Sequence, residues 1–162
     1  MKGVLVLGNA GMASIYKNRL VVSNETCNLA SVREFIQASL KNTRLPEEEH
    51  GKMVLAVDEA VSNIIRHAYE DFAKGSRTIE IDFSADDTKI TLVLIDSGKE
   101  FDPSAIYEPD IAEHIKLGKR YGLGLFLMRR VMDEVKFIFR SGIENRLTMV
   151  KYLPGAHDGG GK

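Results

Sequence analysis

The spacing of apolar and polar positions along this chain changes several times, and each spacing predicts a helix or a strand. Apolar residues that recur every three or four positions predict helices over residues 29–40, 46–69 and 125–135. Alternating residues or short apolar runs predict strands over residues 20–22, 79–83, 90–95, 135–139 and 147–153. This order predicts an α+β fold: a two-layer sandwich in which three helices cover one face of a mixed, mostly antiparallel sheet.

The two ends of the chain lack this pattern. Residues 1–18 contain a short apolar run, Val4–Leu7, and we expect an N-terminal extension that is frayed or adds an edge strand. Residues 155–162 are rich in glycine and are expected to form a flexible tail. The segment between them, residues 19–154, has the length of one domain and contains no repeat or linker. We therefore predict a single domain between two short ends.

The charge balance argues against two classes of partner. The chain has 22 basic and 23 acidic residues, which give a net charge of −1. Nucleic acids and anionic membranes are usually bound by a basic surface, so we expect neither as a direct partner. No apolar run approaches the ~20 residues that span a bilayer. The single cysteine, Cys27, cannot form an internal disulfide, and we expect a cytoplasmic location.

The second predicted helix carries Glu59 and Asn63 one turn apart. At about 100° per residue, these side chains lie one above the other, away from the apolar stripe of the helix. A carboxylate and an amide oxygen are hard ligands that suit Mg²⁺, and the carboxylate is also able to accept a proton from a nucleophile. Taken alone, such a pair is more often typical of a solvated helix face.

Asp96 and Gly98 directly follow the apolar strand predicted over residues 90–95. An aspartate at the end of a buried strand is able to accept a hydrogen bond from an exocyclic amine such as that of adenine. A glycine two residues later lets a ligand approach the backbone closely. An ordinary turn uses the same residue types, so this motif alone does not establish a binding site.

Gly122 and Gly124 open the third predicted helix. Backbone N–H groups at a helix N-terminus bind phosphate, and glycines there leave them accessible. Lys119 and Arg120 come just before these glycines and would add positive charge beside a bound anion. A lone pair of glycines is a weak signal, because glycine also permits tight packing.

The joint occurrence of these three motifs, in this order, is more specific than any one of them. With them the sequence resembles the GHKL ATPase superfamily, and more closely the bacterial anti-sigma-factor serine kinases of partner-switching systems. The resemblance covers roughly residues 19–153, and its strongest stretches are residues 58–69, 96–103 and 122–135. It implies the GHKL (Bergerat) ATPase fold for nearly the whole domain.

The resemblance also implies roles for individual residues. Asn63 would hold a Mg²⁺ ion that bridges the phosphates of ATP, and Glu59 would be the general base that accepts the proton of the attacking hydroxyl. Asp96 would bind the adenine amino group, with Gly98 beside the base. Thr148 lies near the position of an adenine-binding threonine of the family, although Leu147 replaces the small residue that usually precedes it.

Residues 104–121 correspond to the ATP lid of the family, in which Lys119 or Arg120 would neutralise the γ-phosphate. The start of the third helix would bind the phosphates. The nucleotide contacts implied in this way are Asn63, Asp96, Gly98, Lys119, Arg120, Gly122, Leu123, Gly124, Leu125 and Thr148.

The function implied by the resemblance is that of an ATP-dependent serine protein kinase and anti-sigma factor. Its cofactors would be ATP or ADP and Mg²⁺, and its substrate a STAS-domain anti-anti-sigma factor. A sigma factor would be a second partner, and a homodimer is implied. Two alternatives stay open: a nucleotide-dependent binding switch without significant kinase activity, and the nucleotide-binding half of a larger sensor kinase.

Overall fold

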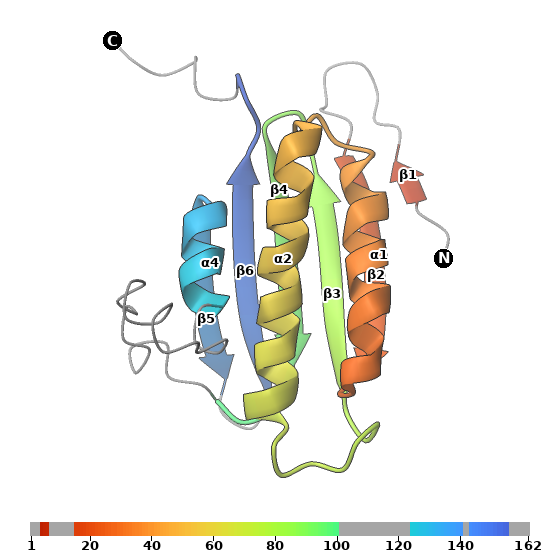
Figure 1. The fold of residues 1–162 in the computed structure, drawn as a ribbon, viewed down its shortest axis with the longest axis vertical. Helices are drawn as coiled ribbons and strands as arrows, with labels where there is room; N and C mark the ends of the chain where they lie inside the picture. The colour runs from red at the N-terminus through yellow and green to blue at the C-terminus, as the bar shows by residue number, and fades with distance from the viewer. Residues whose placement is uncertain (1–3, 7–14, 101–123, 141–142, 156–162) are drawn as a thin grey trace, which may run out of the picture.

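The structure is a computed structural model of the 162-residue chain, and it describes residues 4–6, 15–100, 124–140 and 143–155. One antiparallel sheet forms one layer, and the helices pack on one of its faces to form the other (Figure 1). The strands are β1 (Val4–Val6), β2 (Ile15–Ser23), β3 (Thr78–Ala85), β4 (Lys89–Asp96), β5 (Glu134–Arg140) and β6 (Glu144–Tyr152). The helical segments are η1 (Thr26–Asn28), α1 (Leu29–Leu40), α2 (Glu47–Asn63), η2 (Ile64–Ala68) and α4 (Gly124–Val131).

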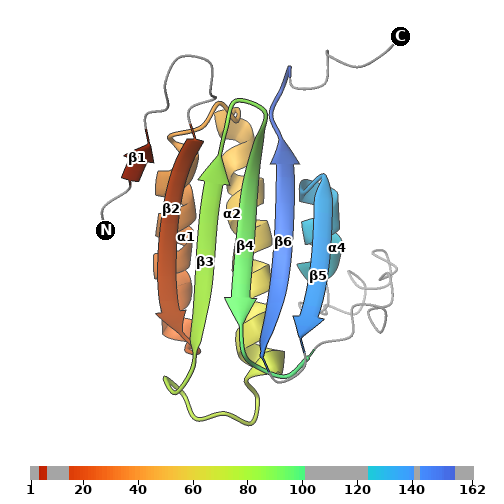
Figure 2. The same cartoon turned by 180° about the vertical axis from the view of Figure 1, so that it is seen from behind.

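The sheet of the described residues has the order β1-β2-β3-β4-β6-β5, and every pairing in it is antiparallel. The predicted α+β sandwich is confirmed, with α1, α2 and α4 on one face; no parallel pairing occurs among the described strands. Figure 2 shows the opposite face of the sheet, which none of the described helices covers. No helix in the described part of the chain has the length and apolar character needed to cross a membrane.

The core lies between the sheet and the helices. Side chains alternate along β3 and β4, so that every second residue faces α1 and α2 and is buried. The apolar stripes of the two helices cover these residues. The largest fully buried side chains are Phe35, Phe83, Ile36, Leu40, Met53, Ile79, Ile81, Ile90, Leu92, Leu94, Met149 and Val32.

The sheet begins before the predicted start of the domain, and the edge strand expected in the N-terminal extension is confirmed as β1. Strand β2 starts at Ile15, so the predicted domain start at residue 19 falls inside it, and β1 pairs with β2 through Leu5 and Tyr16. The first half of β2 is held by polar contacts: Arg19 pairs with Asp82 on β3. Part of the predicted N-terminal extension therefore belongs to the sheet.

Candidate functional site

The candidate site lies at the end of the sheet where β4 finishes and β6 begins. Asp96, the last residue of β4, is paired with Asn145 of β6. The C-terminal end of α2 and the first turn of α4 lie at this same end of the sheet (Figure 1). The antiparallel topology thus brings residues that are far apart in sequence to the same end of the sheet.

Asp96 is the buried acidic residue of this site. Its side chain faces the helix layer, and only 7% of the residue is exposed. Oδ1 accepts a hydrogen bond from the backbone N–H of Gly98 at 2.8 Å and from the side-chain amide of Asn145 at 3.0 Å. Oδ2 accepts none from another described residue. Burial raises the pKa of the Asp96 carboxyl above its ordinary value, and the two hydrogen bonds oppose that rise.

Gly98 lies in close contact with the end of the helical layer. A Cβ atom at this position would lie 2.5 Å from the carbonyl oxygen of Ala68 and 2.7 Å from its Cβ. The same carbonyl oxygen accepts a hydrogen bond from the backbone N–H of Lys99 at 2.8 Å. The loop after β4 is therefore joined to the end of η2, and only glycine fits at position 98.

Substitution of Gly98 by alanine is expected to destabilise the protein by about 1–3 kcal/mol, because the new methyl group must displace the Ala68 backbone. The matched control is Gly51→Ala in the second turn of α2, where a Cβ atom would meet nothing within 4 Å. That change is expected to stabilise the protein by about 0.4–1 kcal/mol through a less flexible unfolded chain. Urea unfolding of both variants measures the two effects, and equal effects of the same sign would contradict the steric argument.

Glu59 and Asn63 lie on successive turns of α2, and both side chains are half-buried. Neither makes a hydrogen bond or an ion pair with another described residue. The neighbouring acid, Asp58, differs because it forms an ion pair with Arg33 at 2.8 Å. The structure thus leaves a carboxylate and an amide oxygen available on one face of the helix, which is the donor set that Mg²⁺ prefers.

After Asn63 the helix widens into a π-helical turn, η2, which covers Ile64–Ala68. Such turns are rare and occur often at functional sites. Tyr69 follows, with 3% of the residue exposed. Its hydroxyl donates to the carbonyl oxygen of Thr78 at 3.1 Å and accepts from the backbone N–H of Ser97 at 2.9 Å. Burial raises the pKa of the Tyr69 hydroxyl above its ordinary value.

Thr148 does not join Asp96 in the structure. Along β6 the buried residues Asn145, Leu147 and Met149 alternate with more exposed ones, and Thr148 is among the latter. Its side chain therefore points to the face of the sheet that the described helices leave open, whereas Asp96 points to the helix layer. The residue that contacts Asp96 from β6 is Asn145, which belongs to none of the three sequence motifs.

The remaining predicted contacts lie in or beside residues 101–123. Lys119, Arg120, Gly122 and Leu123 are outside the described residues. Gly124 and Leu125 form the first turn of α4. The described part of the chain contains no cluster of three or more histidine, cysteine, aspartate or glutamate residues that could hold a metal ion by itself. A metal at this site would therefore need ligands beyond the protein, as an ATP-bound ion has.

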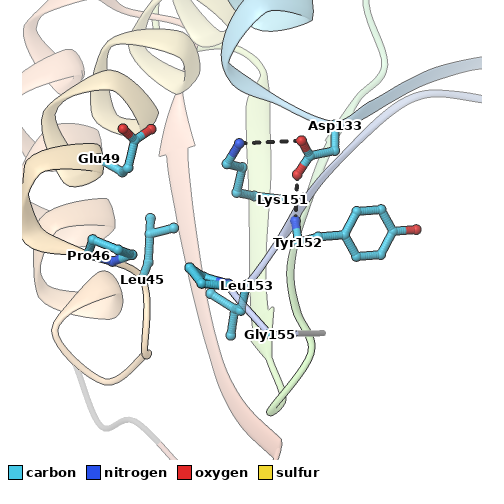
Figure 3. A pocket seen from close by; sticks show the side chains of 9 residues that line it. Leu45, Pro46, Glu49, Asp133, Lys151, Tyr152, Leu153 and Gly155 are labelled. Carbon is cyan, nitrogen blue, oxygen red and sulfur yellow. Dashed lines mark hydrogen bonds and ion pairs between the residues drawn. The ribbon is translucent and has the colours of Figure 1, made fainter. Parts of the chain in front are cut away.

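A pocket of about 570 Å³ lies at the opposite end of the sheet, where Lys89 of β4 pairs with Tyr152 of β6. Lys151 and Asp133 form an ion pair across it at 3.4 Å, and Asp133 also accepts a hydrogen bond from the Tyr152 N–H (Figure 3). The first turn of α2 borders this pocket, far from Asn63 at the other end of the helix. The lining residues are Leu45, Pro46, Glu49, Asp133, Lys151, Tyr152, Leu153, Pro154 and Gly155.

Comparison with known proteins matches residues 22–151 to the family model described as a histidine kinase-like ATPase domain. The chain is 38% identical over 103 residues to Serine-protein kinase RsbW of Staphylococcus aureus, strains bovine RF122 / ET3-1 and MRSA252. These alignments cover 61% of this chain and 63% of each relative, so the chain spans less than two thirds of their length.

The fold is also similar to a solved structure, that of the RsbU and RsbW domains of Rv1364c from Mycobacterium tuberculosis. The TM-score is 0.58 at 15% sequence identity, and the match covers 85% of this chain and 33% of the other. This likeness concerns the fold alone, and it agrees with the sheet and helix layers described above.

Proposed function

The chain belongs to the family of histidine kinase-like ATPase domains, and we propose that it is an ATP-dependent serine protein kinase acting on a STAS-domain anti-anti-sigma factor. Membership of this family implies that ATP is the nucleotide. The observation that carries the proposal is the arrangement at one end of the sheet, where a buried Asp96 lies near a helix whose Glu59 and Asn63 are unpaired among the described residues. The similarity to the serine-protein kinases of S. aureus supports the choice of serine.

Adenine would be bound at Asp96. An adenine ring carries an amino group that donates hydrogen bonds, and Oδ2 of Asp96, which accepts none from another described residue, is a suitable acceptor for it. Ala68 fills the place that a side chain at residue 98 would take, so Gly98 lets the loop after β4 pack against η2, and the base would lie beside that loop. The N-terminal turn of α4, with the glycines at residues 122 and 124, would bind the phosphates through its backbone N–H groups.

Asn63 would hold Mg²⁺ through its amide oxygen, with the remaining ligands supplied by phosphate oxygens and water. The ion, when bound, would neutralise charge on the phosphates. Lys119 and Arg120, in the segment corresponding to the lid, would add positive charge at the γ-phosphate. Phosphoryl transfer depends mostly on such alignment and neutralisation, so the protein needs few groups that take part in bond making.

Glu59 would act on the incoming serine. The serine hydroxyl oxygen attacks the γ-phosphorus, the bond from that phosphorus to the β,γ-bridging oxygen breaks, and the hydroxyl proton passes to the Glu59 carboxylate. The products are phosphoserine on the partner and ADP. Because Asp58 is paired with Arg33, Glu59 is the acid on this turn that is available for the proton.

The further parts of the proposal concern assembly. A sigma factor would be the second partner of the protein, which would bind it as an anti-sigma factor. A homodimer would form through the sheet, whose outer face is left open by the described helices (Figure 2). Analytical ultracentrifugation of the full chain measures the oligomeric state directly.

The test of the function is a transfer assay. The protein is mixed with γ-labelled Mg-ATP and candidate STAS-domain proteins, and the labelled residue is identified by mass spectrometry. Phosphoserine on the partner is the expected result. Stable nucleotide-dependent binding without label would replace the proposal by a binding switch, and phosphohistidine would indicate part of a sensor kinase.

A further inference from the structure

Asn145 carries a buried side-chain amide to which the proposed function assigns no role. It is the second residue of β6, and 7% of it is exposed. Its Nδ2 donates to Oδ1 of Asp96 at 3.0 Å, to the carbonyl oxygen of Gly98 at 3.0 Å and to that of Lys99 at 3.3 Å. One amide group thus contacts the binding carboxylate and the loop behind it.

The orientation of this amide follows from its surroundings. All three groups around Nδ2 are hydrogen-bond acceptors, and one of them is a carboxylate. The opposite orientation of the amide would place its oxygen against three oxygens, which is repulsive. Asn145 is therefore fixed as a donor toward Asp96.

This arrangement makes the two oxygens of Asp96 different. Oδ1 receives two hydrogen bonds, from Gly98 N–H and from Asn145, and is held on the protein side. Oδ2 accepts no hydrogen bond from another described residue and is left to a ligand. Without Asn145 the carboxylate would have one donor fewer, would rotate more freely, and would hold a proton more readily.

We propose that Asn145 is a positioning residue for the nucleotide base: it fixes the Asp96 carboxylate so that Oδ2 accepts from the exocyclic amino group of adenine, and it thereby sets the preference for adenine over guanine. Guanine has a carbonyl oxygen at the corresponding ring position, which an ionised and fixed carboxylate repels. The inference rests on the ATP binding in the proposed function, and it does not require phosphoryl transfer.

The test compares ATP with purine riboside 5′-triphosphate, which lacks the amino group, in equilibrium binding to the full chain. Wild-type protein is expected to bind ATP at least roughly tenfold more tightly, since a hydrogen bond to a charged group contributes that much. Asn145→Leu is expected to remove most of this difference and to weaken the discrimination between ATP and GTP. A purely structural role would lower the affinity for both nucleotides by the same factor.

Two further variants keep the result interpretable. Asn145→Ser is smaller and retains one donor, so it serves if the leucine variant does not fold, and it should give an intermediate ratio. Asn24→Leu is the matched control, because Asn24 is a buried asparagine that holds backbone groups of Ala73 and Arg77 and does not contact Asp96. It is expected to change stability and leave the ratio unchanged.

Three results would overturn the proposal: equal affinities of the wild-type protein for the two nucleotides, an unchanged ratio in both Asn145 variants, or a ratio lowered equally by Asn24→Leu. A chain that binds ATP with the expected ratio but labels no partner would contradict the kinase function and leave the role of Asn145 supported. The two failures are therefore distinguishable.

Discussion

Substitution of Asn63 by alanine is expected to abolish useful binding of Mg-ATP, with a loss of affinity on the order of 100-fold or more. Asn63 lies at the end of α2, and its side chain carries the amide oxygen proposed to bind the ion. The side chain is half-buried, and it makes no hydrogen bond to another described residue. Alanine keeps the helix, since it has the highest helix propensity, and removes the oxygen that would bind the ion. Isothermal titration calorimetry with Mg-ATP gives the affinity.

The dependence of ATP affinity on Mg²⁺ gives a second test of the metal assignment. If Asn63 acts through the ion, chelation of Mg²⁺ should weaken ATP binding in the wild-type protein far more than in Asn63→Ala. The control is Asn42→Ala, since Asn42 is an exposed asparagine whose amide contacts only the backbone of Ala38 among the described residues. Unchanged Mg-ATP affinity in the Asn63 variant would remove the metal assignment.

Substitution of Glu59 by alanine should have the opposite profile: ATP binding is retained, and phosphoryl transfer falls by about 10²–10⁴-fold. The reason is that the carboxylate would contact the incoming hydroxyl and not the nucleotide. Single-turnover transfer from labelled Mg-ATP to the unphosphorylated STAS-domain partner measures the chemical step, and calorimetry on the same sample measures binding.

The matched control for this experiment is Asp58→Ala, one residue away on the same helix. Its carboxylate is engaged by Arg33, and an exposed ion pair of this kind contributes no more than about 1 kcal/mol to stability. The Asp58 variant should therefore fold and transfer phosphate at nearly the normal rate. A Glu59→Ala protein that still transfers phosphate at the normal rate would exclude Glu59 as the base.

Much of the fold could be predicted because apolar residues recur with a clear period in several segments of the sequence. The alternation in Ile79, Ile81 and Phe83 marks β3, and the apolar stripe of α2 marks its buried face. The apolar pattern does not reveal the first half of β2, because Asn18, which faces the helix layer and bonds to Ser39, interrupts the apolar alternation between Tyr16 and Leu20. Alternation of apolar residues does not report a strand of that composition.

The site was predictable only where its geometry is local. Glu59 and Asn63 are joined by one helical turn, which the sequence spacing encodes. The contact between Asp96 and Asn145 depends on the pairing of β4 with β6, across 49 residues, and no local signal reports it. For Thr148 a signal was present: apolar Leu147 and Met149 on either side place it on the other face of the strand.

The hydrogen bonds that join the loop after β4 to the helix layer would lower the conformational entropy that is lost when a nucleotide binds. Tyr69 holds Ser97, and Ala68 holds Lys99, so the carboxylate proposed to bind the base and the end of α2 proposed to bind the metal belong to one preorganised body. A nucleotide that binds there would not have to order this part of the protein, and little conformational entropy would be lost on this side of the ligand.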